Sequence, residues 1–514
     1  MDAAEMMTAT PQFDAALQVI AALRAEGHEA YLAGGCVRDL LLGREPHDYD
    51  VATSATPDLV LGLFPRTFAV GAHFGVVLVS TSGGVATRGG ADAAGAAEEK
   101  QEESRFVVTE VATFRSDGAY SDGRHPDAVR YTSSAEEDVR RRDFTMNGLL
   151  LDVERLFPKG LKPTSIDAFA ARLKSRPDTK QSSDLKESSD GEQFQQNLRA
   201  AVIDHVGGLA DLEAGIVRAI GQPTERFEED HLRMLRAVRF AARFDFQIDP
   251  ATAAAIRRLA HKTKAVSRER VRDELTKMLT EGHGRRAFEL LDETALLAEV
   301  LPEVARMKGV EQPPQFHPEG DVWTHTLLLL GQLEAGCPLP LAWGALLHDV
   351  GKPATFRRAE RIRFDGHVDV GVAIAADICR RFRFSNDETR QTLSLIENHM
   401  RFADATRMKA STLKRFFRLE DFPQHLALHR MDCLAGGGNL DHWNFVRERY
   451  EAMPEEAVRP NPLVTGRELI AAGYTPGAAF KTMLRAVEDA QLEGAITTTA
   501  EGLTLLRNRF PLAG

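Results

Sequence analysis

Two acids separated by one residue form the first group of side chains with catalytic potential. Asp48 and Asp50 lie in a strand-like run over 48–53. On a strand, side chains two apart point to the same face, so Tyr49 would point to the other. Carboxylate oxygens suit Mg²⁺, although solvated acids at a strand end are the alternative for this pattern alone. Glu110, in the strand-like run RFVVTEVATFR, could add a third carboxylate for two-metal catalysis of phosphoryl transfer.

Glycines and arginines near these acids could bind a nucleotide. Gly34 and Gly35 join a strand-like segment to a helical one, and such a turn lets backbone N–H groups approach a phosphate. Arg38 follows in the first turn of that helix, where a guanidinium could reach the same phosphates. In the run DVRRRDFTMNGLLLD, Arg142 could hold a triphosphate and Asn147 could contact a sugar or base. A solvated charge run is the alternative for the arginines.

The segment EEDHLRMLRAVRFAARF, residues 228–244, predicts an amphipathic helix with one acid and four arginines on its polar side. Asp230 can accept hydrogen bonds and Arg233 can donate them, so the pair could read the Watson–Crick edge of a base. Arg236 and Arg239 continue the same face. Considered alone, the segment also fits a solvated face with ion pairs between residues three apart.

A second group of metal-binding residue types lies in the C-terminal half. His348 and Asp349 are adjacent in the apolar run GALLHDVGK, where burying an unpaired imidazole and carboxylate would be costly. Metal coordination would explain them. Imidazole together with carboxylate favours a divalent transition metal over an oxygen-only Mg²⁺ site. Other residues of the same types lie on both sides of this pair: His325, His367, His399 and Asp432.

The elements that must position these groups form an α/β pattern followed by a helical one. Strand-like runs recur up to about residue 131, and helical periodicity dominates after about residue 200. A chain of 514 residues exceeds one compact core, so several domains are expected. Residues 83–103 are rich in Gly, Ala and Glu and lack large apolar side chains, and residues 175–199 are polar and rich in Ser, Asp and Gln. This composition predicts two mobile loops on the surface of the N-terminal domain.

Composition excludes several classes of protein. With 43% hydrophobic and 27% charged residues, the chain is too apolar to be disordered and too charged for a membrane bundle. No uncharged apolar stretch of about 18 residues occurs and no secretory signal is visible. Four separated cysteines suit a reducing compartment, so we expect a cytoplasmic protein. The net charge of −11 does not exclude RNA, because residues 216–290 carry 16 Lys and Arg against 11 Asp and Glu.

With these motifs in this order, residues 29–300 resemble the class II tRNA nucleotidyltransferase and poly(A) polymerase family, apart from the two loops. The resemblance is carried by GGCVRD, DYD, RRDFTMN, a GGxxDL element, EDHLRMLRAVRF and SRERVRDEL. It implies an α/β nucleotidyltransferase head, a small mixed sheet with helices, followed by an all-α neck, body and tail. By resemblance, Asp48 and Asp50 bind catalytic Mg²⁺, and Asp230 with Arg233 selects CTP or ATP. Further nucleotide contacts are implied for Gly35, Arg38, Arg142, Arg236 and Arg239.

The motifs around His348 resemble the HD phosphohydrolase superfamily. This resemblance implies four core metal ligands: His325, His348, Asp349 and Asp432. Two further histidines could extend the site to a second metal: His367 and His399. An HD module behind such a head is similar to certain bacterial CCA-adding enzymes, where it is associated with phosphohydrolase activity. A degenerate HD fold kept for packing and tRNA contact is the alternative.

Together, these features favour a CCA-adding enzyme that uses CTP and ATP on the tRNA acceptor end, with no membrane or DNA partner. Residues 113–131 look like the flexible loop of enzymes that add the complete CCA. Two alternatives stay open: a poly(A) polymerase or A-adding enzyme of the same family, and an HD phosphohydrolase whose head only binds nucleotides. The predicted division is head 1–153, insertion or linker 154–200, neck 201–300, HD domain 301–455 and tail 456–514.

Overall fold

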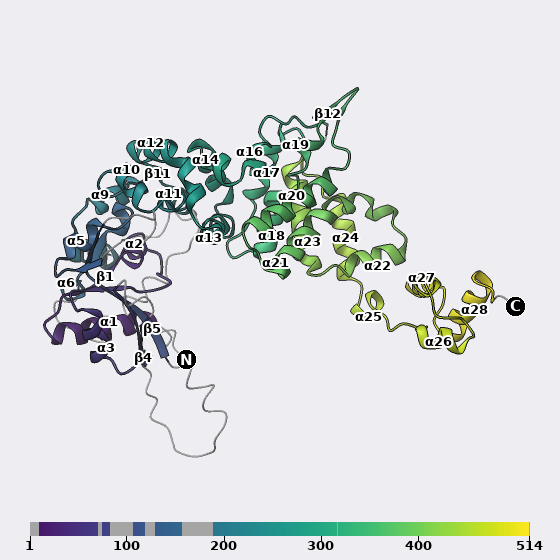
Figure 1. Ribbon diagram of the computed structural model, residues 1–514, viewed down its shortest axis with the longest axis horizontal. Coiled ribbons are helices and arrows are strands. Elements are labelled where there is room, and N and C mark those ends of the chain that lie inside the picture. Colours follow the sequence, from purple (N-terminus) through teal and green to yellow (C-terminus); the bar gives the residue numbers. More distant parts are fainter. Residues whose placement is uncertain are drawn as a thin grey trace, which may run out of the picture. The chain divides into compact units, whose positions relative to one another are not determined.

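The computed structural model of the chain describes residues 10–69, 75–82, 106–118, 129–156, 189–315 and 317–512. The chain divides into two compact units, Met1–Val266 and Ser267–Gly514. The first unit contains the large sheet, in purple to teal in Figure 1, and the second is mainly helical, in teal through green to yellow. The predicted loop 83–103 lies outside the described residues, as do 119–128 within the predicted flexible loop.

The first unit is built on a seven-stranded mixed sheet in the order β3-β4-β5-β2-β1-β8-β9. Strands β2 and β5 run parallel, with Val51 opposite Val111, and the other neighbouring strands are antiparallel. All three residues of β2 and of β8 are buried, as expected at the centre of a sheet covered on both faces. The strands are β1 Ala30–Ala33, β2 Val51–Thr53, β3 Thr67–Phe68, β4 Val76–Ser82, β5 Phe106–Thr113, β8 Leu149–Leu151 and β9 Val202–Asp204.

Two helices frame the first strand. Helix α1 (Pro11–Ala25) begins after Thr10, whose side chain accepts a hydrogen bond from the N–H of Phe13, and it buries an apolar face against the sheet. Helix α2 (Gly35–Leu41) follows β1 through Gly34, whose φ of 73° is a conformation that glycine adopts without strain. The helix expected after Gly34 and Gly35 is confirmed as α2.

Three local predictions are wrong. The strand expected from residue 48 begins only at Val51, so Asp48 and Asp50 precede it, although the carbonyl of Asp50 still accepts the N–H of Ala33. Residues 189–199, expected to form a mobile loop, belong to helix α8 (Ser189–Ala201), whose Leu198 is fully buried and supplies the anchor. Residues 175–188 lie outside the described part of the chain.

The third correction concerns the helix expected over 228–244. Helix α10 (Pro223–Glu229) and helix α11 (Arg233–Phe244) are separate, because Asp230 has an extended backbone, with φ −141° and ψ 105°. Its side-chain Oδ1 accepts the N–H of Leu232 at 3.0 Å, a local bond that competes with helical pairing.

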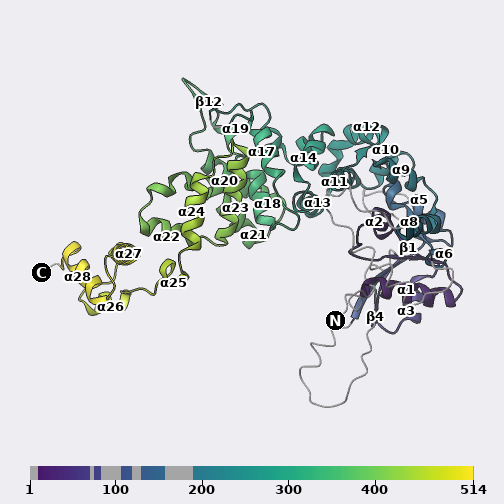
Figure 2. The same ribbon diagram turned by 180° about the vertical axis from the view of Figure 1, so that it is seen from behind.

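The second unit consists of helices and one small hairpin. The HD region uses α17 (Val322–Leu330), α18 (Leu339–Leu347), α19 (Lys352–Thr355), α20 (His367–Arg381), α21 (Asn386–Asn398) and α23 (Phe422–Ala435). Between α19 and α20 lies the hairpin of β12 (Arg357–Arg358) and β13 (Ile362–Arg363), visible in Figure 2. Helices α26 (Gly466–Ala471), α27 (Ala479–Leu492) and α28 (Thr499–Arg509) share a separate apolar core near the C-terminus. The predicted fold class, an α/β head followed by all-α regions, is confirmed. None of the described helices is long and apolar enough to cross a membrane.

Candidate active site and metal centre

The parallel pairing of β2 and β5 brings two of the predicted carboxylates together. Because Val51 lies opposite Val111, the residues one position earlier also match: Asp50 just before β2 and Glu110 within β5. Burial and the neighbouring Glu110 raise the pKa of Asp50 to about 6, and burial and Asp48 raise the pKa of Glu110. Mutual repulsion of this kind is relieved by a bound cation.

Asp48 stands at the open side of this group. Its side chain is 79% exposed and its Oδ2 lies 3.1 Å from Nδ1 of His47. Tyr49 points the other way and packs its ring against Phe13 in the core, 5.1 Å between centroids. The carboxylates of Asp48, Asp50 and Glu110 are more widely spaced than the metal-ligand groups of the described residues, whose ligand atoms all lie within 4.8 Å. Mg²⁺ bound to exposed carboxylates usually completes its oxygen ligands with water and substrate phosphate.

Arginines border the turn at Gly34. A Cβ added at Gly34 would lie 3.0 Å from Nη1 of Arg142, so this guanidinium covers the turn. Asp138 orients it, with its Oδ2 3.0 Å from Nη2 of Arg142. Arg38 is buried and donates from Nη1 to Oδ1 of Asn147 at 2.6 Å. The predicted phosphate-binding residues thus meet around one turn.

A polar chain links this turn to helix α11. Asn147 donates from Nδ2 to Oδ1 of Asp143, and Arg236 lies 2.7 Å from the other oxygen of the same carboxylate. Burial alone would raise the pKa of Asp143, but Arg236 and Asn147 hold this pKa at about 2. A permanently charged Asp143 therefore fixes Arg236 beside the head.

The pair expected to read the base lies at the break between α10 and α11. Nη1 of Arg233 is 2.6 Å from Oε2 of Glu229, and its Nη2 donates to the carbonyl of Arg141 at 3.1 Å. These bonds hold the guanidinium of Arg233 in one orientation next to Asp230. Arg239 is 6% exposed and its guanidinium lies 4.3 Å from the ring centroid of Phe240, so it faces the interior rather than open solvent.

In the second unit, three buried histidines direct Nε2 toward the carboxylate of Asp349. The distances to an oxygen of Asp349 are 3.2 Å from His348, 3.7 Å from His367 and 3.8 Å from His399. Each Nδ1 donates to the backbone carbonyl three residues earlier, which leaves a lone pair on Nε2. None of these Nε2 atoms has a hydrogen-bond partner among the described residues.

The fourth predicted histidine completes the centre on the other side of His348. Nε2 of His325 lies 2.9 Å from Oδ1 of Asp432, and its Nδ1 lies 2.7 Å from Oε1 of Glu319. Burial lowers the pKa of His325, but the bonds to Asp432 and Glu319 outweigh it and raise the pKa to about 9. By contrast, burial lowers the pKa of His399 to about 4.

Three residues of this centre escaped the sequence analysis. Nδ1 of His317 lies 2.8 Å from the same oxygen of Glu319 that contacts His325. Nζ of Lys352 lies 2.7 Å from Oδ2 of Asp349. The segment HPEG just before the WTH motif, and the lysine three residues after Asp349, are the signals that could have revealed them.

A close backbone contact brings His367 into the centre. A Cβ added at Gly351 would lie 2.1 Å from the carbonyl oxygen of His367 and 2.6 Å from the N–H nitrogen of Gly371. Only glycine allows α20 to start this near to the segment that carries Asp349.

The donor set fits a divalent metal. Three overlapping groups have ligand atoms within 4.8 Å: His317, Glu319 and His325; His325, His348 and Asp349; and Asp349, His367 and His399. Buried lone pairs without hydrogen-bond donors are costly unless a cation uses them. Mixed imidazole and carboxylate ligands suit a transition metal, and the sharing of Asp349 by two groups suits a pair of ions.

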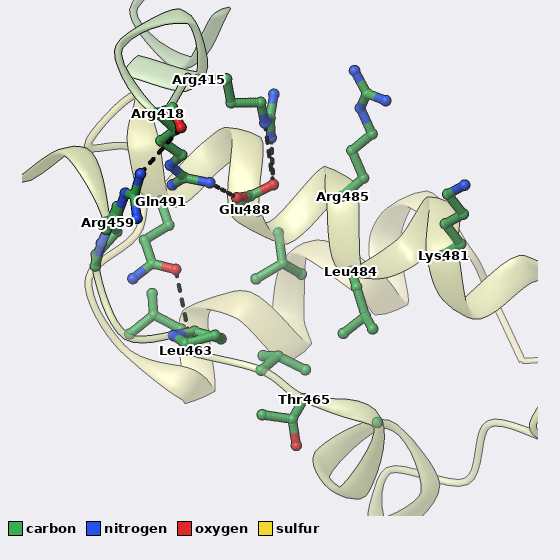
Figure 3. Close-up of a pocket in the computed structure, with 15 residues that line it drawn as sticks. Arg415, Arg418, Arg459, Leu463, Thr465, Lys481, Leu484, Arg485, Glu488 and Gln491 are labelled. Atoms are coloured by element: carbon green, nitrogen blue, oxygen red, sulfur yellow. Dashed lines mark hydrogen bonds and ion pairs between the residues drawn. The ribbon is translucent and has the colours of Figure 1, made fainter. Parts of the chain in front are cut away.

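A cavity of about 840 Å³ lies elsewhere in the second unit, between α27 and the end of α22 (Ala410–Phe417) (Figure 3). Arg415 and Arg418 turn toward Glu488, whereas Arg485 and Lys481 extend away from it. Its lining contains none of the predicted site residues.

Comparisons with known proteins match both centres to families. The poly A polymerase head domain matches residues 30–160, a probable RNA- and SrmB-binding site of polymerase A matches 245–308, and the HD domain matches 322–457. The CCA-adding enzyme of Geobacillus stearothermophilus is 34% identical over 339 residues, which cover 65% of this chain and 67% of that protein. The chain belongs to the family of CCA-adding enzymes.

Other CCA-adding enzymes support this assignment. That of Lactobacillus johnsonii is 34% identical over 322 residues, 62% of this chain and 64% of that protein. The match therefore spans a little under two thirds of that relative. The crystal structure of the Bacillus stearothermophilus CCA-adding enzyme in complex with CTP is 25% identical, with a TM-score of 0.64, and covers 97% of this chain and 98% of that one. The resemblance predicted from the motifs is confirmed.

The metal centre of this family member can be tested by its stoichiometry. In the purified protein carrying Asp48→Ala and Asp50→Ala, which removes the proposed metal ligands of the head, we expect up to two ions per chain after dialysis against Mn²⁺, because two ligand groups share Asp349. His348→Ala and His399→Ala should each lose at least one ion by elemental analysis. His261→Ala, an exposed histidine of the first unit, is the control. Unchanged Mn²⁺ content in both site variants would contradict the assignment.

Proposed function

We propose that this chain adds CCA to the 3′ end of tRNA from CTP and ATP, with release of pyrophosphate. The observation that carries the proposal is the group of Asp48, Asp50 and Glu110 beside the arginine-bordered turn at Gly34, in a chain of the CCA-adding family. Its relatives are named for this activity, and the related crystal structure contains CTP. The tRNA acceptor end is the proposed partner, and the cytoplasm the proposed location.

The proposed reaction forms a bond between the tRNA 3′ oxygen and the α-phosphorus and breaks the bond to pyrophosphate. Asp48 and Asp50 would hold Mg²⁺, with Glu110 adjacent. When bound, Mg²⁺ supplies activation of the hydroxyl and stabilisation of charge on the phosphate oxygens. Arg38, Arg142 and the backbone at Gly35 would hold the triphosphate.

The nucleotide would be chosen by protein side chains alone. Asp230 and Arg233 present an acceptor and a donor to the base, and the bonds from Arg233 to Glu229 and Arg141 fix its direction. Arg236, held by Asp143, would contact the phosphates or sugar. Arg239, which is buried on α11, would help to position the residues around Arg236.

The carboxylates are tested by extension of a tRNA that lacks its terminal CCA. With CTP alone, the wild type should add two residues and stop, and with CTP and ATP it should add three. Asp48→Ala should lower incorporation by about a thousandfold or more, because a metal ligand of the reaction is lost. Asp58→Ala, an exposed acid on α3 (Pro57–Leu63), should extend normally. Long A-tracts made from ATP alone would instead identify a poly(A) polymerase.

Base selection is tested through Arg233. Arg233→Ala should change the ratio of CTP to ATP incorporation by about tenfold or more, while the rate with the better nucleotide falls less, because a base contact discriminates rather than catalyses. The measurement is kcat/KM for each nucleotide on tRNA ending in C and in CC. A ratio equal to that of the wild type would exclude the template role.

We further propose that the second unit hydrolyses phosphate esters. The buried, unpartnered Nε2 atoms of His348, His367 and His399 around Asp349 support this function. His325, Asp432 and these residues would hold a divalent transition metal, which when bound supplies an activated water and polarises the phosphate. Oxygen from water would bond to phosphorus, the ester P–O bond would break, and the leaving oxygen would take a proton. Lys352 would stand beside the developing negative charge.

The two activities should separate by mutation. Asp349→Asn should abolish Mn²⁺-dependent hydrolysis of a 2′,3′-cyclic mononucleotide and leave CCA addition within about twofold of the wild type, because the two centres lie in different units. Asp48→Ala should have the reverse effect. Hydrolysis by Asp349→Asn at the wild-type rate would assign the hydrolysis to another site or to a contaminant.

A further inference from the structure

The hairpin beside the metal centre carries an excess of positive charge. Residues 351–366, GKPATFRRAERIRFDG, contain five Lys and Arg against two Asp and Glu. The segment lies between Asp349 and His367, two candidate metal ligands, with only Val350 separating it from Asp349. In both ribbon views the hairpin that bears the label β12 projects from the helices around it (Figures 1 and 2).

The arginines of this hairpin are not neutralised by the protein. Arg358 pairs with Glu311 at 2.6 Å, but the exposed side chains of Arg357, Arg361 and Arg363 have no ion pair or hydrogen bond among the described residues. Arg357 lies directly opposite Arg363 in the antiparallel register. Like charges in that position repel, and an anion bound between them would relieve the repulsion.

Aromatic rings connect the hairpin with the metal centre. Phe356 is a large apolar side chain with 37% exposure, and its ring lies 6.0 Å from that of Phe364. Phe364 in turn lies 6.5 Å from the ring of His367, and Nζ of Lys352 stands 5.4 Å from its centroid. An exposed ring among guanidinium groups is the combination on which unpaired bases stack.

We propose that this hairpin binds a single-stranded RNA end and delivers its terminal phosphate to the metal centre. The proposal rests on the hydrolase function proposed above and names its substrate class. A free mononucleotide carries one phosphate, and the metal centre itself can hold that phosphate. No further phosphate would then be available to pair with the three arginines of the projecting hairpin. A strand supplies successive phosphates for Arg357, Arg361 and Arg363 and an unpaired base for Phe356.

Binding is tested by site-resolved crosslinking, because the first unit is also expected to contact RNA. The full-length protein, without added metal, is irradiated with a short single-stranded RNA containing 4-thiouridine, and crosslinked peptides are identified by mass spectrometry. We expect crosslinks within 353–364, reduced about tenfold in the triple variant Arg357→Ala, Arg361→Ala and Arg363→Ala and retained in the corresponding triple Lys variant. Arg507→Ala with Arg509→Ala, on exposed α28, is the control. Absence of crosslinks in 353–364, or crosslinks unaffected by the triple Ala variant, would overturn the proposal.

Hydrolysis provides the second measurement. For the Mn²⁺-loaded protein, kcat/KM for an oligonucleotide ending in a 2′,3′-cyclic phosphate should exceed that for the cyclic mononucleotide by about tenfold or more. The triple Ala variant should lose this preference, hydrolyse the mononucleotide as before, and reduce the slope of log kcat/KM against log salt by about two, which corresponds to three phosphate contacts on a single strand. Phe356→Ala should lose about tenfold on the oligonucleotide alone.

The outcomes separate the two proposals. Equal kcat/KM values for oligonucleotide and mononucleotide, unchanged in the triple Ala variant, would overturn the RNA substrate while leaving the hydrolase function in place. If neither substrate is hydrolysed, the hydrolase function fails, and the crosslink map still decides whether the hairpin binds RNA. Crosslinks that an acidic protein displaces but unlabelled RNA does not would identify the hairpin as a protein-docking site and overturn the proposal.

Discussion

Repulsion between carboxylates at the start of the β2–β5 pair is the constraint around which the first unit is organised. The parallel register that buries Val51 and Val111 also fixes Asp50 beside Glu110, so the charges cannot separate without loss of the sheet's core. Arg142 is the only one of the main influences on Asp50 that lowers its pKa, and Arg142 is itself held by Asp138. The head therefore places a cluster of carboxylates beside a turn bordered by arginine, an arrangement that would suit the proposed two-metal phosphoryl transfer.

The second unit also brings polar side chains together, but most of them are histidines instead of carboxylates. There, backbone carbonyls take the Nδ1 protons of His348, His367 and His399, and this fixes both the tautomer and the direction of each ring. Glu319 does the same for His325. In both units, secondary structure brings polar groups together, and under the proposed function a bound cation would offset the cost of burying Asp50 and the three Nε2 atoms.

The motifs DYD and HD, and the family that they indicate, could be predicted from the sequence, because their residues are close neighbours along the chain. The roles of the site residues and the five-part division stay predictions. His317, Glu319 and Lys352 were missed, since their importance arises from contacts with Asp349 and His325 that tertiary packing creates. The break between α10 and α11 at Asp230 was missed, because the spacing of apolar residues does not show that the Asp230 side chain accepts the N–H of Leu232.

The candidate metal ligands include residues of α17, α20 and α23 and the residues at the ends of α18 and α21, and they meet only when those helices have packed. An unfolded chain offers no equivalent site, so any ion held there acts as a folding ligand for the second unit. At a free metal concentration one hundredfold above Kd, the stabilisation would be about 2.7 kcal/mol per site. The unfolding temperature of this unit would then rise with the concentration of free metal. When metal is scarce, the helices that carry the candidate ligands would unfold at a lower temperature.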